Sequence, residues 1–209
     1  KEKDDELLAF RDVSFRFADA EEDTLSHLNF VCRRGETTAI IGGTGSGKST
    51  IASLILRFHD VTDGEVCLNG TDIRRMPQHY LRDHLAYVQQ KAWLFSGTIA
   101  SNLSYSNKDA SEQELMHAAE VAQASEFIRS LPDGLNSFVA QGGTNFSGGQ
   151  KQRLSIARAL VKKPELYIFD DSFSALDFKT DAALRKALSK ETQDAAVLII
   201  AQRVSTIQH

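Results

Sequence analysis

A glycine-rich stretch early in the chain restricts the possible folds more than any other feature. The letters GGTGSGKST begin at Gly42, directly after the β-branched apolar run 37–41, and IASLILRF follows with apolar residues at helical spacing. This order of strand, loop and helix matches G-x-x-x-x-G-K-[ST], in which backbone N–H groups surround phosphates at a helix N-terminus. A plain glycine-rich turn before a helix is the alternative. The lysine and serine at the required places favour a phosphate-binding loop.

Phosphate and metal contacts are divided among the residues of this loop. Lys48 brings a positive charge to the β- and γ-phosphates, and Ser49 offers a hydroxyl to Mg²⁺. Further contacts with the nucleotide are expected from Gly42, Gly43, Thr44, Gly45, Ser46, Gly47 and Thr50. The sequence therefore predicts a nucleotide site that includes magnesium.

An apolar run that ends in two aspartates is the second feature. The letters LYIFDD occupy 166–171, and Asp170 directly follows four apolar residues. A magnesium nucleotide site needs a carboxylate at the end of a neighbouring buried strand, where it meets the metal through water. For an isolated match the alternative is an aspartate that only caps a helix. Because the phosphate loop lies upstream, Asp170 is predicted to be a metal ligand.

A serine followed by two glycines marks the start of another predicted helix. Ser147 can cap this helix, whose apolar stripe lies within 154–161. Gly148 and Gly149, which precede Gln150, weaken a helix but allow bare N–H groups to approach an anion closely. An N-capped helix with no further role is the alternative. The glycines favour a second phosphate-binding helix end.

Composition limits the class of protein. The 209 residues are 42% hydrophobic and 25% charged, which is typical of one globular domain. A net charge of -4 argues against a broad basic surface, so no nucleic-acid partner is expected. Cys32 and Cys67 lack the spacing of a disulfide framework or a zinc site. No apolar run reaches about 18 residues. The chain is expected to be soluble as written and, since it opens on Lys1, to be a domain excised from a longer protein.

Periodicity predicts an α/β domain with a helical insertion. The expected elements are an antiparallel hairpin of 8–17 with 25–31, strands at 37–41, 65–69, 85–89, 166–170 and 195–201, and helices after the phosphate loop, at 111–130, from Ser147 and at 178–191. The whole chain, 1–209, is predicted to be one domain. Its α/β core is expected at about 1–90 and 160–209, with a helical subdomain at about 91–159.

These motifs together resemble the ATP-binding cassette (ABC) family, whose signature LSGGQ stands here as FSGGQ. The resemblance covers essentially the whole chain. It implies a P-loop NTPase core with a mostly parallel sheet flanked by helices, an N-terminal antiparallel β subdomain and an α-helical insertion. It also implies ATP and Mg²⁺ as cofactors. In this family two cassettes pack head to tail, and each ATP lies between the phosphate loop of one and the signature helix of the other.

The stretch FSGTIASNL and the segment before the signature look most like exporters of the half-transporter type. This resemblance implies a transmembrane domain as partner and a location at the cytoplasmic face of the cell membrane. Phe17 matches the aromatic residue that stacks on adenine, with a core strand residue as the alternative. Gln90 matches the glutamine that touches Mg²⁺, and Asp177 matches the aspartate that communicates across the dimer. Gln141 stands where the family usually has a glutamate.

Two catalytic positions depart from the family pattern. Asp171 replaces the glutamate that polarises the attacking water, which shortens the reach by one methylene, about 1 Å, and can cost ~10²-fold in rate. Gln202 replaces the histidine that bonds the γ-phosphate, and an amide cannot carry a positive charge. The sequence therefore predicts a degenerate site with weak hydrolysis, in a heterodimer whose second cassette has the consensus site. A slow but ordinary hydrolase is the alternative.

Two other classes share this nucleotide site. One is a soluble cassette ATPase of DNA repair or translation, and the other is a regulatory ATP-binding gate without turnover. Long coiled-coil insertions or a second fused cassette would favour the soluble class, and the sequence has neither. The transported substrate is left open among drugs, lipids and peptides.

Overall fold

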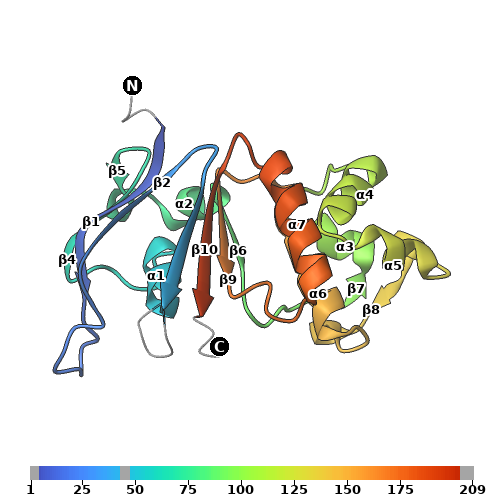
Figure 1. Cartoon of the computed structure of the whole chain (residues 1–209), viewed down its shortest axis with the longest axis horizontal. Coiled ribbons are helices and arrows are strands. Elements are labelled where there is room, and N and C mark those ends of the chain that lie inside the picture. Colours follow the sequence, from blue (N-terminus) through green and yellow to red (C-terminus); the bar gives the residue numbers. More distant parts are fainter. Residues whose placement is uncertain (1–4, 43–47, 203–209) are drawn as a thin grey trace. The chain divides into compact units, whose positions relative to one another are not determined.

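The structure is a computed structural model that describes residues 5–42 and 48–202, without the side chains of residues 48, 49 and 202. The described chain forms two compact units (Figure 1). The first unit takes its residues from Lys1–Ala86, Glu165–Asp171 and Gln193–His209, and the second from Tyr87–Pro164 and Ser172–Thr192. The subdomain boundaries expected near residues 91 and 159 stay a prediction, since contact units and functional subdomains are different divisions.

An antiparallel sheet in the order β2-β1-β4-β5 forms one part of the first unit. Its strands are β1 (Glu6–Phe15), β2 (Leu25–Arg33), β4 (Asp63–Leu68) and β5 (Thr71–Asp72). β1 pairs antiparallel with both β2 and β4, which confirms the predicted hairpin and extends it.

The two cysteines lie on opposite faces of this sheet. Leu8 of β1 faces Cys32, whereas the next residue, Ala9, faces Cys67. Successive residues of a strand point to opposite faces, so the two thiols cannot meet. Both cysteines are free and buried, and burial raises the pKa of the Cys32 thiol to about 11.

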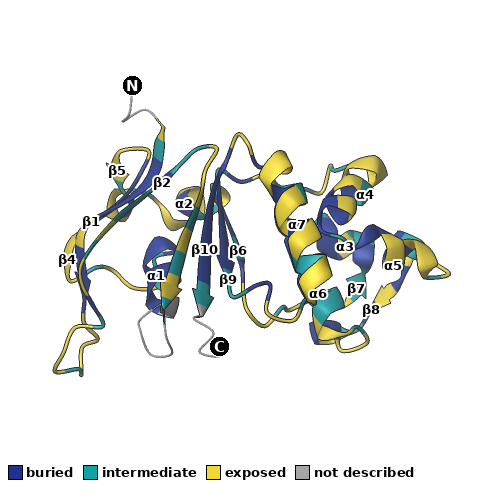
Figure 2. Cartoon of the chain, viewed as in Figure 1, coloured by how far each residue is buried: buried dark blue, intermediate teal, exposed yellow. Residues whose placement is uncertain are grey.

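A second sheet has the order β3-β10-β9-β6, and its first three strands belong to the first unit. Its strands are β3 (Thr37–Gly42), β10 (Ala196–Gln202), β9 (Leu166–Asp170) and β6 (Leu85–Val88). β10 runs parallel to both β3 and β9. The first four residues of β9 are all buried (Figure 2), as the continuous apolar run LYIF predicts for a strand covered on both faces.

Helices of the first unit are short. They are α1 (Lys48–Ile55), the 3₁₀ turn η1 (Ile73–Arg75) and α2 (Gln78–Asp83). α1 packs against β3, β9 and β10 through its buried residues Ile51, Leu54 and Ile55. The helix expected after the phosphate loop is therefore confirmed, and it lies on the parallel sheet.

The second unit is mainly helical. It contains the short hairpin β7 (Gly97–Thr98) with β8 (Phe138–Val139), the helices α3 (Ile99–Leu103), α4 (Glu112–Val121), α5 (Ser125–Ser130), α6 (Gly148–Lys162) and α7 (Phe178–Glu191), and the 3₁₀ turns η2 (Gly134–Asn136) and η3 (Gln141–Gly143). α6 packs against α3 and α4, and α7 contacts α4. The predicted starts of α6 and α7 are confirmed, and the fold as a whole is the predicted mixture of an antiparallel sheet, a parallel sheet and a helical part.

One predicted helix is wrong. The stretch 111–130 forms two helices, because α4 ends in a turn centred on Gln123, which has a φ of 63°. The Gln123 amide donates to the Glu120 carbonyl at 3.1 Å, and the Ala124 amide donates to the Ala119 carbonyl at 2.7 Å. This pair of bonds is the Schellman ending of a helix. Glycine usually occupies the left-handed position, and its absence conceals the break in the sequence.

Candidate functional site

Three of the predicted site residues lie at one edge of the parallel sheet. Gly42 is the last residue of β3 and pairs with Gln202 of β10. Asp170 ends β9 and pairs with Ile200 of β10. Because β10 is parallel to both neighbours, these are the carboxyl ends of three adjacent strands. Ligands of open α/β sheets bind outside this edge, so the phosphate loop and the metal carboxylate leave the sheet where such a ligand would lie.

The phosphate loop itself lies largely outside the described residues. Outside them are Gly43, Thr44, Gly45, Ser46 and Gly47 and the side chains of Lys48 and Ser49. The described parts on either side are β3, which ends at Gly42, and α1, which begins at Lys48. Thr50 is 8% exposed within the first turn of α1. The order strand, loop, helix is therefore present, with the helix N-terminus following the sheet edge.

The two aspartates after β9 have different backbone conformations. Asp170 is the last residue of the strand and is half-buried. Asp171 has a φ of 49°, and its amide donates to the Ile200 carbonyl at 2.8 Å. Aspartate tolerates this left-handed region better than most residues. The backbone of Asp171 is thus held against β10 at Ile200, and Ile200 lies two residues before Gln202 in the same strand.

The predicted magnesium ligands have suitable chemistry. Ser49, Gln90 and Asp170 offer a hydroxyl, an amide and a carboxylate, and Mg²⁺ prefers such oxygen donors. Within the described ranges no group of three or more His, Cys, Asp or Glu residues is arranged to hold a metal. Magnesium at nucleotide sites uses one or two protein ligands together with water and phosphate oxygens. Asp170, at the carboxyl end of β9, fits that kind of site, whereas the magnesium contacts of Ser49 and Gln90 stay predictions.

Phe17 lies just after β1 and is not part of the buried core. The residue is 44% exposed. Its ring makes T-shaped contacts with Phe15, at 4.8 Å between centroids, and with His59, at 5.5 Å. An exposed aromatic ring held by two neighbours suits stacking against a base, and the burial expected of a core strand residue is not observed.

The signature segment caps α6. The Ser147 hydroxyl accepts from the Gln150 amide at 3.1 Å, and the Gln150 side-chain oxygen accepts from the Ser147 amide at 3.0 Å. This capping box leaves the Ser147 hydroxyl hydrogen available for donation to an acceptor. Ser147 and Gly148 are exposed, so the first turn of α6 is accessible.

The two glycines of this turn differ in their surroundings. A Cβ at Gly149 would lie 3.2 Å from the Ala175 carbonyl oxygen, which is a tight contact. A Cβ at Gly148 would lie 3.7 Å from the Ala175 Cβ, which is an ordinary contact. Packing within the chain therefore explains Gly149 but not Gly148. A glycine at position 148 is consistent with a ligand that approaches the helix end closely.

Asp177 caps α7. Its carboxylate accepts from the Thr180 amide at 2.7 Å. This hydrogen bond, with a smaller contribution from the positive charge of Arg153, lowers the pKa of the Asp177 carboxyl. The role expected for Asp177 across a dimer stays a prediction, because capping already explains an aspartate here.

Gln90 lies two residues after β6, and its side chain is exposed. The Gln90 carbonyl accepts from the side-chain amide of Gln152 at 2.8 Å. Sequence reasoning missed Gln152. The sequence signal that could have found it is a polar residue on the same face of the helix as the apolar stripe of α6. In the structure, Gln152 is 3% exposed.

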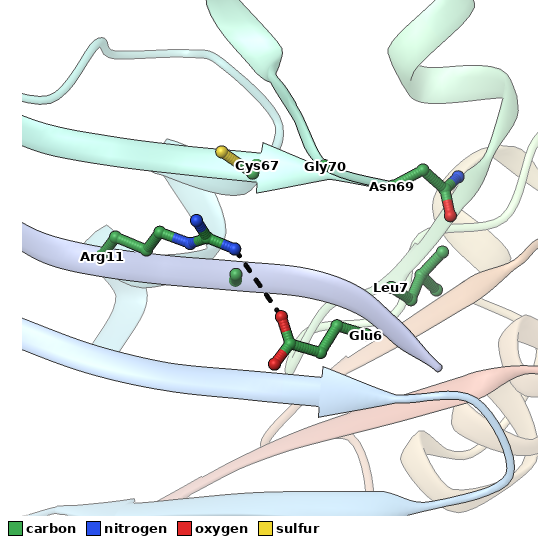
Figure 3. Close-up of a pocket in the computed structure, with 7 residues that line it drawn as sticks. Glu6, Leu7, Arg11, Cys67, Asn69 and Gly70 are labelled. Atoms are coloured by element: carbon green, nitrogen blue, oxygen red, sulfur yellow. Dashed lines mark ion pairs between the residues drawn. The ribbon is translucent and has the colours of Figure 1, made fainter. Parts of the chain in front are cut away.

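A cavity of about 380 Å³ opens on the antiparallel sheet, and none of its lining residues is a predicted site residue (Figure 3). It is lined by Glu6, Leu7, Ala9, Arg11, Cys67, Asn69 and Gly70. Arg11 and Glu6 form an ion pair across it at 3.7 Å, and burial raises the pKa of the Cys67 thiol. The charges there are paired and the thiol is not activated, so the cavity has no evident chemistry.

Among the helices that the structure describes, none is both long and apolar enough to cross a membrane.

Comparison with known proteins identifies the family. The sequence pattern of the ABC transporter family matches residues 25–174, and the chain belongs to this family. It is 46% identical over 196 residues to an ABC transporter ATP-binding protein of Mycobacterium bovis, covering 92% of this chain and 33% of that protein. It is 43% identical over 202 residues to an ATP-dependent lipid A-core flippase of Vibrio parahaemolyticus, covering 96% of this chain and 35% of the flippase.

A solved structure agrees with these sequence relatives. The structure of a bacterial Atm1-family ABC exporter with ATP bound superposes with a TM-score of 0.89 at 37% identity, covering 97% of this chain and 35% of the exporter. The chain is thus an ATP-binding domain of the ABC transporter family with exporter-type relatives. It spans about a third of the length of the relatives it matches.

Proposed function

We propose that this chain is the ATP-binding cassette of a membrane exporter and binds MgATP to power export of a substrate. The observation that carries the proposal is the sheet edge at which β3, β10 and β9 end, with Gly42, Gln202 and Asp170 on adjacent parallel strands. The likeness to an exporter with ATP bound supports the same site. The relatives support the exporter class, and a soluble ATPase of DNA repair or translation is not favoured.

Each predicted residue has a defined task in this proposal. Phe17 stacks on the adenine, and Lys48 with the backbone of the phosphate loop holds the phosphates. Asp170, Ser49 and Gln90 hold the magnesium ion. When bound, magnesium neutralises charge on the phosphate oxygens. Its partners in this proposal are a transmembrane domain and a second cassette, and this cassette acts at the cytoplasmic face of the membrane.

Hydrolysis at this site is proposed to be weak. The carboxylate of Asp171 has a shorter reach than the family's glutamate, and its backbone is fixed by the bond to Ile200. A fixed backbone cannot move forward to recover the lost distance of about 1 Å, which corresponds to ~10²-fold in rate. Gln202 supplies hydrogen bonds but no positive charge. The first turn of α6 then serves the ATP of a second, different cassette.

A turnover measurement tests this division of roles. We expect the Asp171→Glu, Gln202→His double variant to raise ATP turnover of this cassette ~10²-fold, because both lost groups are restored. Affinity for MgATP should stay within about threefold, since the phosphate loop, Phe17 and the magnesium ligands are unchanged and histidine at 202 can still bond the γ-phosphate. Ordinary turnover by the wild-type cassette without a partner would show that the site is not degenerate.

A further inference from the structure

A single buried side chain connects two predicted site segments of the second unit. Gln152 lies in α6 and is 3% exposed. Its amide nitrogen donates to the Gln90 carbonyl at 2.8 Å, and its amide oxygen accepts from the Ala175 amide at 3.1 Å. Both ends of the side chain are therefore bonded to backbone outside α6. One bonded segment contains Gln90, and the other leads to Asp177.

A second buried bond joins the same two segments. The Ser172 hydroxyl donates to the Val88 carbonyl at 2.6 Å, and Ser172 is completely buried. Residues 88–90 are thus linked to residues 172–175 both directly and through Gln152. The latter segment also contacts the start of α6, because a Cβ at Gly149 would lie 3.2 Å from the Ala175 carbonyl oxygen.

The free-energy cost of burying an amide indicates that Gln152 does more than fill space. A buried amide costs free energy unless its donor and its acceptor are both satisfied, and an apolar side chain would fill the same space without that cost. Gln152 makes both bonds. Each bond goes to a backbone group in a loop, where no described helix or strand supplies a backbone hydrogen-bond partner. A satisfied buried polar group of this kind specifies one arrangement of the segments around it.

We propose that Gln152 is a positioning residue that fixes the Gln90 segment, the first turn of α6 and the turn 173–177 as one body. A displacement of Gln90 at the nucleotide then displaces the α6 start and Asp177 with it. This inference rests on the proposed function in one respect, which is that Gln90 meets the bound nucleotide. The link between the segments is independent of it.

Two variants separate the bonds from the packing. Gln152→Met has a similar volume and makes neither bond. Gln152→Glu keeps an acceptor for the Ala175 amide but replaces the donor, so it breaks only the bond to Gln90. Gln113→Met is the matched control, because Gln113 is an exposed residue of α4 outside the site.

The experiment uses the full-length protein that carries this cassette, assembled with its partner. Hydrogen exchange of segments 86–93 and 172–180 is measured with and without MgATP, together with kcat, KM and the thermal unfolding midpoint. In the wild type, we expect MgATP to protect both segments. In Gln152→Met, protection of 172–180 is lost, and kcat falls about 10-fold while KM changes less than about twofold.

The comparison without nucleotide tests the link by itself. There, Gln152→Met should speed exchange in both segments, Gln152→Glu should act mainly on 86–93, and Gln113→Met should change neither. Unchanged exchange and unchanged kcat in Gln152→Met would overturn the proposal, as would a loss of protection spread evenly over the whole protein. If Gln152→Met does not fold, the segment-specific result of Gln152→Glu decides. A wild type that shows no response to MgATP would instead refute the proposed function.

Discussion

Packing within the chain does not require a glycine at position 148. A Cβ there would make an ordinary contact of 3.7 Å with Ala175. We therefore expect Gly148→Ala to fold normally and to gain up to about 1 kcal/mol in unfolding free energy, since alanine favours a helix more than glycine does. Its ATP-dependent association with a second cassette should weaken, because the added methyl stands where a phosphate approaches.

The neighbouring glycine supplies the control for this prediction. Gly149→Ala places a Cβ 3.2 Å from the Ala175 carbonyl oxygen, so it should lower the unfolding free energy instead. Urea unfolding and gel filtration with MgATP measure the two effects. A destabilised Gly148→Ala protein, or one whose association is unaffected, would contradict the assigned role of this helix end.

Asp177 allows capping to be separated from charge. The pKa of its carboxyl is lowered in the folded state, so its contribution to stability is present above the unfolded pKa and is lost as the pH falls through the folded pKa. Asp177→Asn keeps a good N-cap without the charge, so at neutral pH it should lower the unfolding midpoint less than Asp177→Ala does. Thermal unfolding at pH 7 and pH 3 distinguishes the variants. If Asn also loses ATP-dependent association, the charge acts across the dimer as well.

Several site residues could be predicted because their motifs are local. The spacing of glycines, lysine and serine identifies the phosphate loop, and LYIFDD identifies Asp170. The N-cap of α6 could be predicted too, since Ser147 stands directly before the first helical residues, but the returning bond from Gln150 was not predicted. Gln152 could not be predicted, because its partners at Gln90 and Ala175 lie far away in sequence, 62 and 23 positions respectively.

Among the elements, those with a continuous or periodic apolar pattern were predicted, including β4 and the four-residue β6, whereas α2, α3 and the two-residue strands were not. The apolar runs of β9 and β10 and the capped starts of α6 and α7 each carry enough residues to fix the element. α3 has five residues and depends on Asn102, whose buried amide bonds both the amide and the carbonyl of Phe95. Such a contact between loop and helix leaves no periodic signal.

The break between α4 and α5 yields a stability prediction. Gln123 holds a left-handed φ of 63° that costs a non-glycine residue about 1 kcal/mol, so Gln123→Gly should raise the unfolding free energy by about that amount. The control Gln113→Gly, inside α4, should lower it by about 1 kcal/mol. Urea unfolding measures both. A destabilised Gln123→Gly would mean that the Schellman ending does not determine where α4 stops.

For the molecule as a whole, the proposed function gives unequal tasks to two segments of this cassette. The phosphate loop serves a site with weak hydrolysis, whereas the first turn of α6 serves the site that turns over. In the assembled exporter, Gly148→Asp should lower total ATP turnover at least ~10²-fold. The variant places a negative carboxylate where N–H groups must donate hydrogen bonds to the phosphate. Asp171→Asn should lower total turnover less than about twofold.

Steady-state turnover of the two assembled variants tests this asymmetry. The reverse order of effects, with Asp171→Asn the more damaging, would show that this cassette carries the main hydrolytic site. Similar losses in both variants would indicate two equivalent sites.

In the proposed function, the carboxyl edge of the parallel sheet binds a magnesium nucleotide. Calorimetric titration of MgATP into the wild-type protein and into Lys48→Ala tests this binding. We expect saturable binding by the wild type and an affinity at least ~10²-fold weaker in the variant, since a charge-assisted contact with the phosphates is removed. Equal affinities in the two proteins, or no binding by either, would contradict it.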